Sequence, residues 1–436
     1  MRAGARRTSG YPVTPGFKSQ LSPAHSPSSA ALAQPGFWTD LLAAAARRLP
    51  NRRRRLRVYA ELIDSGAMAA AAAAYAELNL ALEPPVRRTI NRAGGRRKTL
   101  FLFGARDELF LRALNTVLQP LAAPLHSPLC HSFQAGRGVR TAYHDLLRRP
   151  GLDTLAWTRM DVRDYFNSIP PDRLLERLPE PLGEDPALVR FLTSTLLDQR
   201  VVSDGEQVLD DHKGAMAGTP LAPLLANLYL APLDDYFEGQ RVLYARYADD
   251  FIVFGTESEV AERAAAVAGI LETLGLELNT RKTRSGGPGE PWEFLGLSYD
   301  RGRLDLAYHT VRKLHGRTRR MARRARRMRD PLGYFVRRLN RRLFGAGGDP
   351  ADFTWGTWFF PMLSGDASLR RLDAVIQAQA RFAGTGRHER RNHRAVPYAR
   401  LLAAGYLPLA AAFHAHARGR GEYLALLEAR CRVRDG

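Results

Sequence analysis

The segment Tyr244-Ala-Arg-Tyr-Ala-Asp-Asp-Phe-Ile-Val-Phe-Gly255 holds two adjacent acidic residues between two short apolar runs. Residues 242–244 and 251–254 favour strands, so the segment predicts a β-hairpin with Asp249 and Asp250 at its turn. Successive side chains on a straight strand point to opposite faces, but at a tight turn two neighbours can reach one spot. Two carboxylates at one spot repel each other, and a hard divalent cation relieves that repulsion. By itself the segment is also compatible with a surface turn that carries two solvated aspartates.

A third carboxylate is available in the segment Trp157-Thr-Arg-Met-Asp-Val-Arg-Asp-Tyr-Phe-Asn-Ser-Ile-Pro170. Asp161 ends a short run that begins at Leu155, and the aromatic pair Tyr165 and Phe166 follows it. A partner carboxylate of this kind favours a metal site over a solvated turn.

These two segments resemble the palm of a reverse transcriptase, in which the first carboxylate precedes an aromatic residue and the second motif is Tyr-Ala-Asp-Asp. Further blocks resemble that family in the same order, between about residues 96 and 296: His131-Ser-Phe-Gln-Ala-Gly-Arg137, Gly214-Ala-Met-Ala-Gly-Thr-Pro220 with the helix after it, Leu274-Gly-Leu-Glu-Leu-Asn-Thr-Arg-Lys-Thr283 and Phe294-Leu-Gly296. The residues of these blocks are most similar to those of bacterial enzymes of the group II intron-like superfamily. Within that superfamily they resemble the unassigned groups, several of which are defence-associated.

The resemblance implies an α+β fold, a right-hand polymerase with helical fingers, an antiparallel-sheet palm and a helical thumb. Composition divides the chain into a disordered basic tail (1–35), a helical extension (36–93), fingers and palm (94–300), and a basic helical thumb with C-terminal helices (301–436).

The resemblance also implies roles for individual residues. Asp161, Asp249, Asp250 and the backbone carbonyl of Val162 are expected to hold two Mg²⁺ ions, with Mn²⁺ able to substitute. Lys282 matches the residue that protonates pyrophosphate, although a plain surface lysine is the alternative. The expected nucleotide-binding residues are Lys98, Arg106, Val162, Phe166 and Gly218, and the expected primer grip is Phe294, Leu295 and Gly296.

The turn before the palm helix departs from the family's common pattern. Many relatives carry Pro-Gln-Gly there, whereas this chain carries Met216-Ala217-Gly218. The missing glutamine bears on template handling and fidelity and leaves the metal chemistry untouched.

Charge is the most distinctive feature of the composition, because 65 Lys and Arg stand against 44 Asp and Glu, a net charge of +21. Such an excess favours a polyanionic partner. Only two cysteines occur, which argues against a disulfide framework or a zinc module. No apolar run is long enough for a membrane span, so a cytoplasmic protein is expected.

Residues 312–342 contain 14 Lys and Arg but one acidic residue, Asp330. Apolar or small residues recur around this segment every three or four positions, which predicts a helix with a narrow apolar stripe and an arginine-covered face. The predicted stripe is Val311, Leu314, Thr318, Met321, Ala325 and Met328. Such a helix suits contact with a template–primer duplex, and a solvated cationic helix is the alternative. The arginines expected to contact nucleic acid are Arg319, Arg320, Arg323 and Arg324.

The sequence therefore predicts an RNA-directed DNA polymerase that takes an RNA template, a DNA or RNA primer and dNTPs, with a dedicated non-coding RNA and an antiviral role as further expectations. Two alternatives stay open, a template-independent DNA polymerase and a basic RNA-binding or maturation factor with a relic polymerase site.

Overall fold

The computed structural model describes residues 26–48, 53–91, 97–210, 213–240, 242–345, 354–389 and 391–431. The chain divides into two compact units, Met1–Ser285 and Gly286–Gly436. Sequence composition placed this division near residue 300, but the hairpins that start at Trp292 pack with the helices of the second unit. There, the Thr310 hydroxyl donates to the carbonyl of Gly296 at 2.8 Å.

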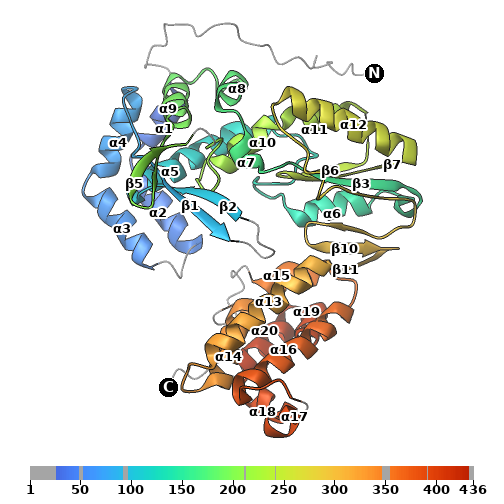
Figure 1. Ribbon diagram of the computed structural model, residues 1–436. Coiled ribbons are helices and arrows are strands. Elements are labelled where there is room, and N and C mark those ends of the chain that lie inside the picture. The colour runs from blue at the N-terminus through green and yellow to red at the C-terminus, as the bar shows by residue number, and fades with distance from the viewer. Residues whose placement is uncertain are drawn as a thin grey trace. The chain divides into compact units, whose positions relative to one another are not determined.

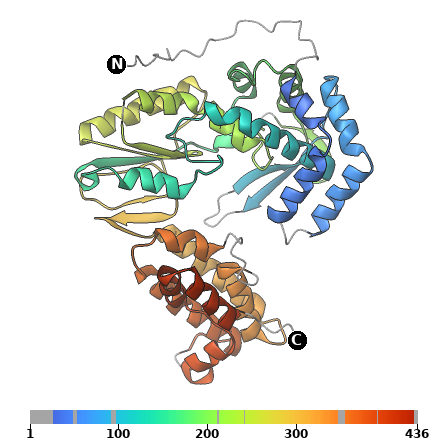
Figure 2. The ribbon, with the colours of Figure 1, turned by 180° about the vertical axis from the view of Figure 1, so that it is seen from behind.

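The first unit combines helices with two small sheets (Figures 1 and 2). Its helices are α1 (Pro27–Leu32), α2 (Phe37–Arg48), α3 (Arg53–Asp64), α4 (Ala67–Ala76), α5 (Ala105–Ala122), α6 (Val139–Leu147), α7 (Tyr165–Ser168), α8 (Pro171–Glu176), α9 (Pro186–Leu196), α10 (Ala222–Tyr229), α11 (Ala231–Gln240) and α12 (Glu257–Thr273). Its strands are β1 (Val86–Asn91), β2 (Arg97–Leu102), β3 (Ala156–Asp161), β4 (Arg200–Ser203), β5 (Glu206–Leu209), β6 (Tyr244–Tyr247), β7 (Asp250–Gly255) and β8 (Arg284–Gly286).

The sheet that carries the acidic residues has the strand order β6-β7-β3-β8, and β7 runs antiparallel to both of its neighbours. Strands β6 and β7 form the predicted hairpin, in which Tyr247 pairs with Asp250 across a two-residue turn. Helix α12 packs against β3 and β7, and α6 packs against β6 on the other face (Figure 1). Strand β7 is buried from Phe251 to Gly255.

The other sheet, β2-β1-β4-β5, is joined to the palm by the glycine turn at residues 214–218. Gly214 has a φ of 54°, and a Cβ atom on it would lie 2.5 Å from the carbonyl oxygen of Phe166. At the other end of the turn, Phe101 of β2 donates its N–H to the carbonyl of Ala217 at 2.9 Å. Only a residue without a side chain allows this close backbone approach, so glycine is required at position 214.

The second unit begins with an antiparallel sheet of β9 (Trp292–Phe294), β10 (Leu297–Asp300) and β11 (Arg303–Leu306). Its helices are α13 (Tyr308–Ala325), α14 (Pro331–Phe344), α15 (Trp355–Phe359), α16 (Ala367–Thr385), α17 (Asn392–Ala395), α18 (Tyr398–Ala403), α19 (Leu409–Arg418) and α20 (Arg420–Cys431). On α13 the buried stripe is Thr310, Leu314, Thr318, Ala322 and Ala325, so the predicted amphipathic helix is present.

The α+β class expected from the sequence is confirmed. The prediction of a disordered tail over residues 1–35 is wrong for residues 26–35, because helix α1 packs there and Leu32 is buried. The Ser28 hydroxyl and the Tyr75 hydroxyl are 2.6 Å apart, which ties α1 to α4. Residues 1–25 lie outside the described part of the chain. Within the described residues, no helix is both long and apolar enough to cross a membrane.

Candidate active site

The three carboxylates predicted from the sequence lie on neighbouring parts of one sheet, at the β6–β7 turn and the end of β3. Asp161 and Asp250 are cross-strand partners in the β3–β7 ladder, and Asp249 lies in the turn beside them. Cross-strand partners have Cβ atoms about 4.5–5.5 Å apart and point to the same face. The N–H of Val162 donates to the carbonyl of Asp249 at 3.2 Å, which ties the turn to the strand end.

Two cations of the chain neutralise two of these carboxylates. Lys282 Nζ lies 2.6 and 2.8 Å from the two oxygens of Asp161. Arg159 donates to both oxygens of Asp250, through Nε at 2.7 Å and through Nη2 at 2.6 Å. Arg159 precedes Asp161 by two residues and therefore lies on the same face of β3. Arg159 was not among the site residues predicted from the sequence, although its two-residue spacing from Asp161 on a strand was a usable signal.

The third carboxylate, Asp249, lacks such a partner among the described residues. Burial, and after it the negative charge of Asp161, raises the pKa of Asp249 to about 6. Burial also raises the pKa of Asp250, an effect that its bonds to Arg159 oppose. The site therefore holds more negative charge than its own cations balance.

The donor set suits a hard divalent cation, because it consists of carboxylate oxygens whose repulsion a metal would relieve. The ammonium of Lys282 and the guanidinium of Arg159 place positive charge beside Asp161 and Asp250. In the described residues, however, no three His, Cys, Asp or Glu side chains converge closely enough to form a ready metal cluster. The three carboxylates thus match the charge of divalent cations. In this structure Asp161 pairs with Lys282, and Asp250 pairs with Arg159.

A buried polar network supports the turn from below. Arg246 of β6 is 1% exposed and forms an ion pair with Asp234 of α11, which the Tyr244 hydroxyl also contacts at 3.1 Å. Arg246 donates through Nη1 to the carbonyl of Ala248 at 3.2 Å, and the N–H of Ala248 donates to Ser132 Oγ at 2.8 Å. Both backbone groups of this turn residue are therefore held from the interior of the protein.

The network continues through Asn227 of α10, which accepts from Ser132 Oγ at 2.8 Å and donates to the carbonyl of Ser132 at 2.6 Å. Sequence reasoning found the segments that carry these residues but not the network. Its members are up to 114 positions apart, and no periodicity links them.

An aromatic cluster lies beside the carboxylates and contains the predicted residue Phe166. The ring of Phe166 is 5.6 Å from that of Tyr165 and 6.4 Å from that of Phe133. Tyr165 is buried, and its hydroxyl donates to the carbonyl of Ala226, whereas Phe166 is half-buried. Of the two neighbouring rings, Phe166 is the one with a face open to solvent.

Two further residues predicted to bind nucleotide lie close to Phe166. Lys98 Nζ is 5.6 Å from the centroid of the Phe166 ring. Gly218 has a φ of 104°, and a Cβ atom on it would lie 3.3 Å from the carbonyl oxygen of Phe101 on β2. The structure thus brings Lys98 and Phe166 together and places Gly218 against the strand that carries Lys98.

Arg106 is not brought to this cluster by any contact among the described residues. Its Nε donates to Asp107 at 2.7 Å, and Asp107 also accepts from the N–H of Glu83 at 2.9 Å. Arg88 of β1 is better placed, because the pairs Arg88–Leu100 and Ile90–Lys98 put it on the same face as Lys98. Arg88 is exposed and is a residue that sequence reasoning missed.

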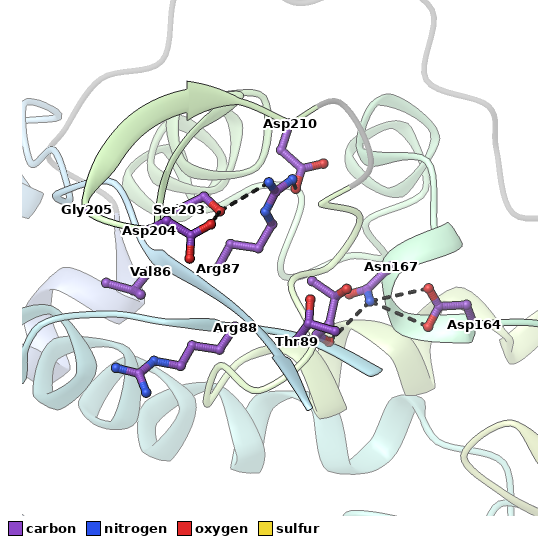
Figure 3. Close-up of a pocket in the computed structure, with 11 residues that line it drawn as sticks. Val86, Arg87, Arg88, Thr89, Asp164, Asn167, Ser203, Asp204, Gly205 and Asp210 are labelled. Carbon is purple, nitrogen blue, oxygen red and sulfur yellow. Dashed lines mark hydrogen bonds and ion pairs between the residues drawn. The ribbon is translucent and has the colours of Figure 1, made fainter. Parts of the chain in front are cut away.

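A polar cavity of about 780 Å³ lies beside the β1–β2 hairpin, and Arg87, Arg88 and Thr89 are among the residues that line it (Figure 3). Figure 3 shows Arg87 directed toward Ser203 and Asp210, with its Nη1 3.0 Å from Asp210 Oδ2. Asn167 of α7 donates to both oxygens of Asp164 at the other end, at 3.5 and 3.4 Å. Several of the side chains that line the cavity, Arg87 with Asp210 and Asn167 with Asp164, therefore already pair with one another.

The remaining predicted residues belong to the second unit. Phe294, Leu295 and Gly296 form the end and the turn of the β9–β10 hairpin, and the φ values of Leu295 and Gly296 are 47° and 92°. Four predicted arginines lie on the exposed side of α13, where the described residues offer them no carboxylate partner: Arg319, Arg320, Arg323 and Arg324. Burial, together with Arg342 and Arg320, lowers the pKa of the nearby Arg317.

Comparisons with known proteins give one family match and partial matches to individual proteins. Residues 107–299 match the family model described as reverse transcriptase (RNA-dependent DNA polymerase). An uncharacterized 91 kDa protein in the cob intron of Schizosaccharomyces pombe is 29% identical over 159 residues, which are 36% of this chain and 19% of that protein. Protein YkfC of Escherichia coli is 24% identical over 257 residues, which are 49% of this chain and 66% of YkfC.

The chain thus spans less than two thirds of the length of either curated relative. Among solved structures, apo telomerase from Candida tropicalis, truncated from the C-terminal domain, matches 52% of this chain and 56% of its own length, with 12% identity and a TM-score of 0.41. Telomerase from Candida albicans in complex with a fragment of telomeric RNA matches 76% of this chain and 64% of its own length, with 11% identity and a TM-score of 0.42.

Proposed function

Residues 107–299 form a reverse transcriptase domain, and on that premise we propose that this protein is an RNA-directed DNA polymerase that extends a primer with dNTPs on an RNA template. The observation that carries the proposal is the register of β3 and β7, which sets Asp161 opposite Asp250 with Asp249 in the adjoining turn. A relic site would have no need to keep all three carboxylates.

We propose Asp161, Asp249, Asp250 and the carbonyl of Val162 as the groups that hold two Mg²⁺ ions. When bound, such a pair supplies activation of the primer 3′-hydroxyl and neutralisation of the triphosphate. The raised pKa of Asp249, caused by burial and by Asp161, supports this role because the site carries uncompensated negative charge.

Other residues of the domain receive roles from their positions. Lys98 and Arg88 share one face of the β1–β2 hairpin and supply positive charge for the triphosphate. Phe166 lies beneath the ribose of the incoming nucleotide, where its ring excludes a 2′-hydroxyl. Lys282, whose Nζ lies 2.6 Å from Asp161 Oδ1, donates a proton to the leaving pyrophosphate.

We also propose that Phe294, Leu295 and Gly296 contact the primer and that the arginine face of α13 contacts the template–primer duplex. The absence of carboxylate partners for these arginines among the described residues supports this role, because densely packed like charges favour a polyanion. A dedicated non-coding RNA, an antiviral role and a cytoplasmic site of action are proposed on the family resemblance alone.

The proposal is tested with the variant Asp249→Asn/Asp250→Asn on poly(rA)·oligo(dT) with dTTP and Mg²⁺. Incorporation should fall below detection, because amides cannot supply the charge that holds the ions. The variant should keep the circular dichroism spectrum of the parent and its affinity for the template–primer.

Asp204→Asn is the matched control, because Asp204 is also a hairpin-turn aspartate but lies at the exposed β4–β5 turn. It should keep parental activity. Full incorporation by the double variant would overturn the polymerase proposal. Sequencing products made with and without added RNA separates templated from template-independent synthesis.

A further inference from the structure

Phe133 combines two properties that are unusual for a large apolar residue. Its side chain is 37% exposed, and its backbone adopts a φ of 55°. A bulky residue in the left-handed region is strained, and such strain persists only where the surroundings impose it. Strained positions of this kind concentrate at functional sites.

The surroundings of Phe133 impose this conformation through the residues on either side of it. The N–H of His131 donates to the carbonyl of Arg246 at 2.8 Å, and Ser132 is bound to Asn227 and to Ala248 of the catalytic turn. On the other side, Gln134 Nε2 donates to the carbonyl of Cys130 at 2.9 Å. The loop is thus fixed to the same buried network that holds Ala248, the residue before Asp249.

This fixed loop presents the Phe133 ring to two aromatic residues of the site. Its centroid lies 6.4 Å from that of Phe166 at an interplanar angle of 66°, and 5.9 Å from that of Tyr247 at 54°. Edge contacts of this kind are favourable and depend on ring orientation. Phe166, Tyr247 and Phe133 come from three separate segments, so their meeting is a feature of the fold rather than of local sequence.

We propose that Phe133 is a positioning residue for Phe166 and thereby helps to set the choice between deoxyribonucleotides and ribonucleotides. The inference rests on the proposed function, in which Phe166 is the ring beneath the ribose. Phe166 is half-buried and would have room to tilt away from a 2′-hydroxyl if its neighbour were absent. The edge contact from Phe133, held by a strained backbone, prevents that tilt.

The test measures single-nucleotide extension on poly(rA)·oligo(dT) with dTTP or UTP, using the full chain. Phe133→Ala should raise the efficiency of UTP relative to dTTP by about two- to tenfold, which is the worth of one aromatic edge contact. Phe133→Tyr keeps the ring and should keep the parental ratio. Phe133→Gly removes both ring and strain, and it should match Phe133→Ala if the ring is what matters.

Phe166→Val distinguishes failure of this inference from failure of the proposed gate. If Phe166→Val leaves the UTP-to-dTTP ratio unchanged, the gate itself is wrong. If Phe166→Val relaxes the ratio but Phe133→Ala and Phe133→Gly do not, only the positioning role is overturned. An equal loss of efficiency with dTTP and UTP in Phe133→Ala would also overturn the positioning role.

A double substitution gives a second, independent readout. Because Phe133 acts through Phe166, adding Phe133→Ala to Phe166→Val should change the ratio no further. A multiplicative increase in the double variant would mean that the two rings act separately, which contradicts the inference. If Phe133→Ala proves inactive with either nucleotide, Phe133→Leu takes its place and must show the same rise in the ratio, or the inference fails.

Discussion

Asp249 is held in a setting that opposes its ionised form. Burial, and then the charge of Asp161, raise its folded-state pKa to about 6, whereas an unfolded chain gives aspartate a pKa near 3.9. Because the folded pKa is the higher one, the folded state favours the protonated form. The ionised carboxylate therefore lowers the free energy of unfolding above about pH 6, and this penalty disappears below about pH 4.

Asp249→Asn should accordingly stabilise the metal-free protein at pH 8, by up to about 3 kcal/mol, and should have little effect at pH 4. Thermal unfolding in EDTA at the two pH values measures this difference. Asp204→Asn serves as the control and should be neutral at both. A variant that is less stable than the parent at pH 8 would show that the carboxylate of Asp249 has a partner that stabilises it.

Individual residues also show how far sequence reasoning reaches. The hairpin with Asp249 and Asp250 was predicted because an apolar–acidic–apolar pattern is local, and Asp161 was predicted from the short run that it ends. The buried pair of Arg246 and Asp234 was not, because a charged residue inside a strand is ordinarily assigned to the surface. Arg106 was given a triphosphate role from its place in a block, but its neighbour Asp107 holds its side chain.

Helix α13 shows what periodicity can establish for a helix. The three- and four-residue spacing predicted a narrow buried stripe, and the observed stripe shares Leu314, Thr318 and Ala325 with that prediction. Val311, Met321 and Met328 are half-buried instead, and the fully buried Ala322 was not part of the predicted stripe. Spacing fixes the buried side of a helix, but which residues are fully covered depends on its neighbours.

The exposed side of α13 gives a prediction for nucleic-acid binding. Replacing Arg319, Arg320, Arg323 and Arg324 with glutamine should weaken template–primer binding and flatten its salt dependence by about 0.9 in slope for each lost phosphate contact. Fluorescence anisotropy at several salt concentrations measures the slope.

The second unit offers a control with the same number of removed charges. Four of its arginines already pair with carboxylates, namely Arg370, Arg371, Arg391 and Arg418. Their replacement by glutamine should leave the salt slope nearly unchanged. Equal slopes for the two variants would mean that the α13 face is merely solvated.

The chain as a whole consists of two units with separate hydrophobic interiors. The core of the first unit includes Phe110, Phe191 and Phe251, whereas that of the second includes Phe335, Leu339 and Leu372. The candidate carboxylates belong to the first unit and the exposed arginines of α13 to the second. A ligand that binds the carboxylates should therefore stabilise the first unit, and a ligand that binds the arginines should stabilise the second.

Differential scanning calorimetry should resolve two unfolding transitions. Mn²⁺ should raise the melting temperature of the first unit, which carries the carboxylates. Heparin, as a polyanion, should raise that of the second unit, which carries the arginines of α13. In Asp249→Asn/Asp250→Asn the shift with Mn²⁺ should disappear while the shift with heparin remains. One transition that moves with both ligands would instead show that the two units unfold cooperatively.

The network of Ser132, Asn227, Asp234 and Arg246 has a consequence for how this protein can change by mutation. Removing one member of a buried ion pair leaves the other uncompensated, which costs about 3–5 kcal/mol, a large part of the stability of an ordinary domain. Single substitutions at these four positions should therefore be rare among functional variants and should be accepted mainly as coordinated sets. Phe133 and Lys98 are not members of this network, and both are partly exposed. A directed-evolution library that randomises them while holding the four fixed should yield altered substrate preference without loss of the fold.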